Sequence, residues 1–208
     1  MMAGFSFRTM LMILIPAALA ATAIGVVFNG YSSELDDLLG SRPASPAAAN
    51  LPPILMRVAD AMSTADLAGL LAEQFVRAGG PGPSGWLRRN CYPFLITLKF
   101  EKESLLAFFF DRTPFAFPRM TPVRGFERAA LAYFGVPAAR LTTGEAILLF
   151  HIARFPDAPL PVNDPERALE LRDGLLQELF NDRLITRAQF RTESSRPLIL
   201  SGSHPAVW

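Results

Sequence analysis

The sequence predicts a mostly α-helical domain carried on an N-terminal transmembrane helix. Two observations predict the helical class. Apolar residues recur about every 3.6 residues over the central and C-terminal segments, and no segment alternates apolar and polar residues for the length of a strand. An uncharged apolar run near the N-terminus predicts the membrane segment. A chain of 208 residues has room for one domain with short extensions.

The run from Thr9 to Phe28 contains no charged residue and is long enough to cross a bilayer as a helix. Arg8 precedes this run, and acidic residues follow it from Glu34 onward. The positive-inside rule therefore predicts a single span, with the N-terminus in the cytoplasm and the main domain outside.

A cleavable signal peptide is the alternative interpretation, because residues 18–20 have the small-x-small pattern of a cleavage site. We favour an anchor because the apolar run continues beyond that point. The chain then divides into an anchor at 1–31, a Pro-rich linker at 32–53, a helical domain at 54–192 and a C-terminal tail at 193–208.

The first half of the helical domain is predicted as helices separated by breaks. Residues 54–78 keep a helical apolar period, and the Gly- and Pro-rich residues 78–85 end it. Residues 86–110 are apolar and aromatic, and Pro93 within them either starts or kinks a helix. Residues 111–124 contain three prolines and are expected to be mostly loop.

The C-terminal helices carry clear start signals. Residues 142–145 (TTGE) and 186–189 (TRAQ) have the capping-box pattern, in which two side chains satisfy the first free backbone amides of a helix. Asp164 followed by Pro165 is an N-cap with proline at the first helical position. Helices are expected to begin directly after these caps, and the polar residues 193–208 are expected to form a loose tail.

Composition excludes several classes of function. The formal net charge of +1 gives no electrostatic basis for binding nucleic acid. The single cysteine, Cys91, excludes an intramolecular disulfide. The two histidines, His151 and His204, lack metal-ligand spacing, so we expect neither a metal site nor a cofactor. We expect His151 to be a core residue, because its helix is otherwise apolar.

Residues 125–135 (GFERAALAYFG), with Leu-Thr at 141–142 and Glu-Ala at 145–146, resemble the peptidoglycan glycosyltransferases, or transglycosylases, of glycosyltransferase family 51. The family pattern there is G-I-E-A-A-A-x-x-Y-F-G, followed by L-T-x-x-E-A-A. The similarity continues at 163–168 (NDPERA). A weaker match at 102–112 resembles the family motifs S-K-D-E-I-L and Y-L-N-R.

This resemblance extends over residues 50–192 and implies a lysozyme-like fold at the outer, periplasmic face of a bacterial cytoplasmic membrane. Family members polymerise lipid II into glycan strands. In them a glutamate deprotonates the acceptor 4-hydroxyl, and charged or amide side chains with a metal ion stabilise the departing pyrophosphate. The implied ligand is therefore a lipid-linked saccharide.

The match fails where the family holds its catalytic groups. The family's catalytic glutamate lies in an E-D pair, and that place is taken here by residues 62–64 (MST). A second glutamate, in the motif R-K-x-x-E, is replaced by Tyr92, whose phenol, with a usual pKa of about 10, is a poor proton acceptor at neutral pH. Residues 65–74 replace the family's hydroxyl- and amide-rich donor motif, and the lobe around that motif is shortened.

These losses lead us to interpret the chain as a non-catalytic relative that binds a lipid-linked precursor, a glycan or a protein partner. One alternative is a divergent active transglycosylase that uses Glu73, Glu101 or Glu103 as its base. Another is a structural subunit of a membrane complex.

The candidate ligand-binding residues are charged and lie in or beside the matched motifs: Arg88, Arg89, Lys99, Asp111 and Arg112. A solvated surface is the simpler interpretation for Arg88, Arg89 and Lys99. Phe115 and Phe117, in the Pro-rich segment, are candidate membrane contacts, whereas the aromatic residues 108–110 are expected to pack in the core.

Overall fold

The computed structural model describes residues 29, 30, 33, 51–78, 83–117, 120–155, 158 and 160–201. Helices predominate in these residues, which confirms the mostly α-helical class. The span expected at 9–28 lies outside the described residues, as does most of the linker. Within the part that is described, no helix combines the length and apolarity needed to cross a bilayer.

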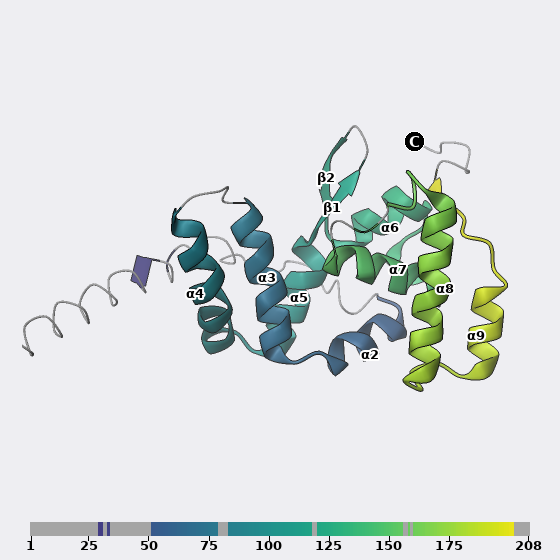
Figure 1. Ribbon diagram of the computed structural model, residues 1–208, viewed down its shortest axis with the longest axis horizontal. Helices are drawn as coiled ribbons and strands as arrows, with labels where there is room; N and C mark the ends of the chain where they lie inside the picture. Colours follow the sequence, from purple (N-terminus) through teal and green to yellow (C-terminus); the bar gives the residue numbers. More distant parts are fainter. Residues whose placement is uncertain are drawn as a thin grey trace, which may run out of the picture.

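From residue 53 onward the first helices are α2 (Pro53–Ala61), α3 (Thr64–Ala78), α4 (Pro83–Lys99) and α5 (Lys102–Arg112). A short antiparallel hairpin follows, made of β1 (Pro114–Phe117) and β2 (Met120–Arg124). Helices α3 and α4 pack side by side, and α5 packs against α3 (Figure 1).

The chain continues through α6 (Phe126–Phe134), a 3₁₀ turn (Ala138–Arg140), α7 (Thr143–Arg154), α8 (Pro165–Asn181) and α9 (Arg187–Ser194). Helix α7 lies centrally and contacts α2, α6, α8 and α9. Helices α8 and α9 lie at one end of the molecule, with α3 and α4 at the other (Figure 1).

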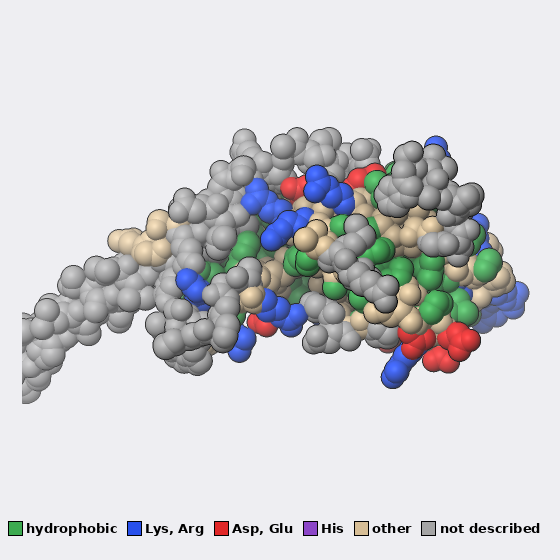
Figure 2. Space-filling model, turned by 90° about the horizontal axis from the view of Figure 1, so that it is seen from above, with side chains coloured by type: hydrophobic (Ala, Val, Ile, Leu, Met, Phe, Trp, Pro, Cys, Tyr) green, Lys and Arg blue, Asp and Glu red, His purple; other side chains and the backbone are tan. Residues whose placement is uncertain are grey.

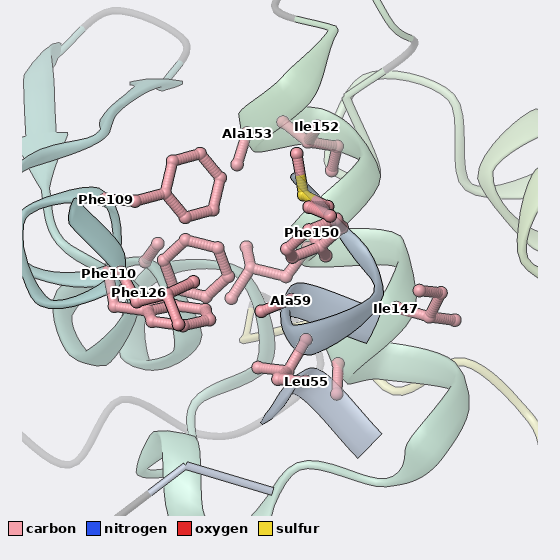
Figure 3. Packing of buried hydrophobic residues seen from close by; sticks show 14 of the residues in the cluster. Leu55, Ala59, Phe109, Phe110, Phe126, Ile147, Phe150, Ile152 and Ala153 are labelled. Atoms are coloured by element: carbon pink, nitrogen blue, oxygen red, sulfur yellow. The ribbon is translucent and has the colours of Figure 1, made fainter. Parts of the chain in front are cut away.

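A layer of aromatic side chains forms the centre of the core. Phe109 packs against Phe150 of α7, with ring centroids 5.6 Å apart, and Phe110 packs edge-on against Phe126 of α6 at 4.8 Å. Leu55 of α2 lies in the same buried cluster (Figure 3). The buried rings of Phe108, Phe109 and Phe110 agree with the predicted core role of residues 108–110.

The helix expected over 54–78 is divided in two, because the chain is extended at Met62. Ser63 then caps α3: its Oγ accepts the amide of Asp66 at 3.1 Å, and the Asp66 carboxylate accepts the amide of Ser63 at 3.1 Å. This reciprocal pair satisfies amides at the start of α3 as a capping box does. The continuous apolar period concealed the cap in the sequence.

Pro93 lies inside α4 and not at its start, so a helix beginning there is a wrong prediction. The helix runs from Pro83 to Lys99, and Thr97 Oγ1 donates to the carbonyl of Pro93 at 2.8 Å.

The loop expected at 111–124 is also corrected, because much of it forms the β1–β2 hairpin. Phe115 pairs with Val123 in register, and its side chain is only 1% exposed. It packs against Phe126 at 5.2 Å, so the membrane contact predicted for Phe115 is wrong. Phe117 is half-buried against Tyr133. In a two-stranded ribbon each strand has a free edge, which accommodates prolines there.

The three C-terminal caps predicted from sequence are confirmed. Thr142 and Glu145 form a capping box at α7, and Thr186 and Gln189 form one at α9. The carboxylate of Asp164 accepts the Arg167 amide at the start of α8.

The segment expected as a loose tail is held to the domain over its first part. Glu193 is buried and accepts the amide of Gly144 at 3.1 Å. Arg172 donates to the carbonyl of Arg196 at 2.7 Å, and Ser201 Oγ donates to the carbonyl of Ala132. For residues 193–201 the prediction is wrong, because polarity alone does not show that these groups have partners in the folded domain.

Candidate functional site

A groove of about 1210 Å³ lies between the C-terminal end of α2, the last turns of α7 and the length of α8. Its apolar surface includes Met62, Phe150 and Leu175. Asp66 lies at the α3 side, and His151 and Arg154 lie on α7. The α8 side contributes four charged groups, Arg167, Glu170, Glu178 and the following Asp182.

The groove includes the place where the resemblance locates the family's catalytic acid. Met62 forms part of its wall and is 8% exposed. Ser63 is occupied in capping α3, and its Oγ donates to Asp66 Oδ2 at 2.7 Å. Neither side chain is a proton acceptor with a pKa near neutrality, so the position expected for the base holds none.

Asp60 and Asp66 are the carboxylates nearest to that position in sequence, and of the two only Asp66 lines the groove. Hydrogen bonds from the side chain and then the backbone of Ser63 hold its pKa below the usual 3.8, with a smaller effect from Arg154. Its side chain is exposed to solvent. A general base for a sugar hydroxyl requires a pKa shifted toward neutrality, and the shift at Asp66 has the opposite sign.

His151 emerges from the buried α7 at the groove. Burial lowers its pKa below 6.5, Glu178 opposes that shift, and Arg154 adds to it. Its ring packs against Phe155, with centroids 4.7 Å apart. The expected core histidine is thus a half-buried groove residue. The sequence could not show this, because the groove forms only where α7 ends beside α8.

The predicted candidates lie elsewhere, and none of them lines this groove. Glu73 pairs with Arg89 at 3.5 Å and with Arg77 at 3.3 Å, across the surface of α3 and α4. All three side chains are substantially exposed, at 38%, 63% and 47% for Glu73, Arg89 and Arg77. Glu101 and Glu103 are exposed at the start of α5.

The other candidates are spread over α4 and α5. Arg88 is half-buried and Lys99 is exposed. The guanidinium of Arg112 lies 5.5 Å from the ring centroid of Phe108. Asp111 is half-buried at the end of α5. Among the predicted residues, Glu73 and Arg89 are joined by a direct ion pair.

Tyr92, which replaces the second glutamate of the family, is fully buried. It lies in the hydrophobic core and does not line the groove. On the face shown in Figure 2, Lys and Arg side chains stand in separate groups with apolar side chains between them. Within the described part of the chain, no three His, Cys, Asp or Glu residues are placed to share a metal ion.

The sequence also missed an exposed apolar pair. Phe94 and Leu98 lie one turn apart on α4 and are 60% and 63% exposed. Residues four apart on a helix share a face, so the two side chains form one small apolar surface. The spacing was visible in the sequence, but only the packing of α4 shows that this face points outward.

Comparison with known proteins indicates which class of protein this chain resembles. Residues 88–180 match the family model described as Transglycosylase. Penicillin-binding protein 1B of Escherichia coli (strain K12) is 28% identical over 117 residues, which are 55% of this chain and 14% of that protein. Penicillin-binding protein 1A of Aquifex aeolicus (strain VF5) is 35% identical over 74 residues, 36% of this chain and 10% of that protein.

A crystal structure of penicillin-binding protein 1A from Haemophilus influenzae aligns with 68% of this chain and 17% of its own, with a TM-score of 0.42 and 17% sequence identity. The chain matches only a small fraction of the length of the curated relatives named above, 14% and 10%.

The class indicated by the family model and the sequence relatives is a transglycosylase domain. The matches support a partial transglycosylase domain over residues 88–180, and the predicted resemblance to glycosyltransferase family 51 is confirmed. The mostly helical fold fits this class. The family match begins at Arg88, after α2, α3 and residues 62–64.

Proposed function

We propose that this chain is a membrane-anchored relative of the peptidoglycan transglycosylases that binds its ligand without polymerising it. One observation carries the proposal: the position expected for the catalytic acid holds Met62 in the groove wall and Ser63 in a helix cap. The domain lies at the outer face of a bacterial cytoplasmic membrane, with an anchor at 1–31, a linker at 32–53 and a folded region at 54–192.

The groups closest to the two expected glutamate positions do not replace the missing base. Asp66 has a lowered pKa and holds the α3 cap, so protonation would cost it that interaction. Tyr92 is buried away from the groove. Proton transfer from an acceptor hydroxyl needs a group within hydrogen-bond reach of substrate and with a suitable pKa, and neither residue meets both conditions.

Binding of a lipid-linked saccharide is assigned in this proposal to the charged residues of α4 and α5: Arg88, Arg89, Lys99, Asp111 and Arg112. Arg89 and Lys99 are exposed, as a diphosphate contact requires. Phe94 and Leu98 on the same helix replace Phe115 as the proposed membrane contact, with Phe117 retained at the half-buried hairpin. Exposed apolar groups beside cations suit an anionic membrane surface.

A binding assay with fluorescent lipid II tests this proposal on the full chain in nanodiscs. We expect saturable binding that weakens with salt and weakens further in Arg89→Gln/Lys99→Gln. The matched control is Arg187→Gln/Arg191→Gln, which removes two exposed cations from α9. Absence of lipid II binding, or equal loss in both double variants, contradicts the proposed site.

A second candidate function is catalysis by a displaced base. The pair of Glu73 with Arg89 favours it, because a carboxylate beside a cation is one element of the family's chemistry. This candidate predicts glycan polymer from wild-type protein and at least tenfold less from Glu73→Gln, with Glu103→Gln unchanged. We favour the binding role because Glu73 is exposed and already pairs with two arginines.

A further inference from the structure

The groove has an ordered pattern of side chains along α8. Glu170, Gly174, Glu178 and Asp182 follow one another at intervals of four residues along one edge. Leu171, Leu175 and Leu179 form a parallel apolar row beside them. Side chains four apart on a helix lie above one another, so the groove has an acidic edge and an apolar floor along the same axis.

The charge of the groove favours a cationic occupant. Four carboxylates line it, from Asp66, Glu170, Glu178 and Asp182, against the two guanidinium groups of Arg154 and Arg167. Within the described part of the chain, the three acidic groups at the α8 edge form no ion pair. A diphosphate or another anion would be repelled by this edge, whereas Lys or Arg side chains would find exposed carboxylates to pair with.

Gly174 opens a gap in the middle of the acidic edge. A Cβ built on this glycine meets no atom within 4 Å, so the space beside it is open. Glu170 and Glu178 stand one turn to either side. A side chain of an incoming segment placed in this open space would lie between the two carboxylates.

The apolar part of the groove extends beyond the α8 row. Met62 and Phe150 contribute from α2 and α7, and Phe155, at the end of α7, is 49% exposed. The α8 edge from Glu170 to Asp182 is about 18 Å long at the helical rise per residue. An apolar channel of that length with one charged edge is the arrangement that binds an amphipathic helix.

We propose that the groove between α2, α7 and α8 is the docking site for an amphipathic helix of a partner protein, with Leu-type residues on one face and Lys or Arg flanking them. The apolar face of this helix covers the leucine row of α8. Its cations pair with Glu170, Glu178 and Asp182. The inference deepens the binding role proposed above and assigns the groove to a protein and not to the lipid-linked saccharide.

Two synthetic peptides test this assignment on the full chain in zwitterionic nanodiscs, with empty nanodiscs as the blank. Both have the same helical pattern of leucines, flanked by lysines in one and glutamates in the other. We expect the lysine peptide to bind at least tenfold tighter than the glutamate peptide. We expect Glu170→Lys/Glu178→Lys to reverse this order.

The matched control is Glu101→Lys/Glu103→Lys, which changes the net charge equally at two exposed positions outside the groove. It should leave the peptide preference within about twofold of wild type. Gly174→Trp should fill the gap and weaken the lysine peptide at least tenfold. Its Cβ meets no neighbour, so circular dichroism should remain that of the wild type and the unfolding midpoint should not fall.

Equal binding of the two peptides, or identical effects of the groove and control double variants, overturns the docking site. Displacement of the lysine peptide by lipid II also overturns it, because the groove would then belong to the saccharide. If peptide binding fails while lipid II is bound and left unpolymerised, only this inference fails. If the peptide docks as expected but the protein polymerises lipid II, only the non-catalytic role fails.

Discussion

Gly144, in the first turn of α7, lies directly against the side chain of Arg172 in α8. A Cβ at Gly144 would stand 2.8 Å from Arg172 Cδ. Arg172 is 3% exposed, and its guanidinium also donates to Asp173 and to the carbonyl of Arg196. This contact lies where α7 packs against α8, and both helices contribute residues to the groove.

Gly144→Ala should therefore destabilise the fold. The added methyl group must displace a buried arginine with several hydrogen bonds, and overpacking of this kind costs about 1–3 kcal/mol. Urea unfolding followed by circular dichroism measures the loss.

The matched control is Gly174→Ala in α8, where the new Cβ meets nothing within 4 Å. Its higher helix propensity should raise the free energy of unfolding by up to about 1 kcal/mol. Equal effects of the two substitutions would show that the Gly144–Arg172 contact has no special role.

Gly125→Ala should be more damaging than Gly144→Ala. Gly125 has a φ of 85°, and its Cβ would stand 2.6 Å from the backbone oxygen of Asp111, which has no rotamer to relieve the clash. Backbone strain and overpacking together predict a loss of about 2–4 kcal/mol. Gly69→Ala in α3, which meets open space, is the control for the thermal midpoints. A Gly125→Ala protein as stable as Gly69→Ala would contradict the geometry.

Local chemistry was the part of the fold that the sequence predicted well. The caps at Thr142, Asp164 and Thr186 were predicted because each depends on residues within three positions of it. The break at Met62–Ser63 also depends on neighbouring residues only. It is not predicted, because the apolar period of α2 continues into α3 and indicates one continuous helix.

Long-range contacts determined what the sequence could not predict. The Phe115 side chain enters the core because Phe126 and Tyr133 of α6 offer it a surface. The groove brings Met62 to residues of α8 that lie more than a hundred positions later. Arg88 and Arg89 are ligand-binding candidates because of their position in a family motif. That position does not show which helices enclose a groove.

Replacing Glu193 tests the attachment of α9 to the domain. Its carboxylate accepts the Gly144 amide at 3.1 Å and pairs with Arg196 at 3.4 Å. Glu193→Ala leaves a buried amide without its acceptor, which costs about 1–3 kcal/mol. Glu193→Gln keeps an oxygen that can accept this hydrogen bond, so it should lower the free energy of unfolding less than Glu193→Ala does. Chemical unfolding measures both, with the exposed Glu103→Ala as a reference that should stay within about 0.5 kcal/mol of wild type.

His151 predicts a specific pH dependence of stability. Its pKa in the folded protein lies below 6.5, chiefly because of burial. Below pH 6.5 the unfolded chain therefore takes up this proton more readily than the folded protein, and the free energy of unfolding falls as the pH decreases. His151→Gln should lose this part of the slope between pH 7.5 and 5.5, as measured by urea midpoints.

Glu178→Gln provides the complementary check, because Glu178 raises the pKa of His151. Removing the Glu178 charge should lower the pKa of His151 further. The free energy of unfolding should then continue to fall down to a lower pH than in the wild type. The lowered pKa of Asp66 acts below pH 3.8 and does not interfere with this window. A wild-type slope retained in His151→Gln would assign the pH dependence to other groups.

The most direct test of the central claim follows labelled lipid II during incubation with the full chain under conditions in which an active transglycosylase of the family consumes it. We predict that the lipid II binds and is recovered intact, with no glycan polymer on a gel. Polymer formation that disappears in Glu73→Gln or Asp66→Asn would contradict the account, because it would show that an acid in this partial domain still serves as the base.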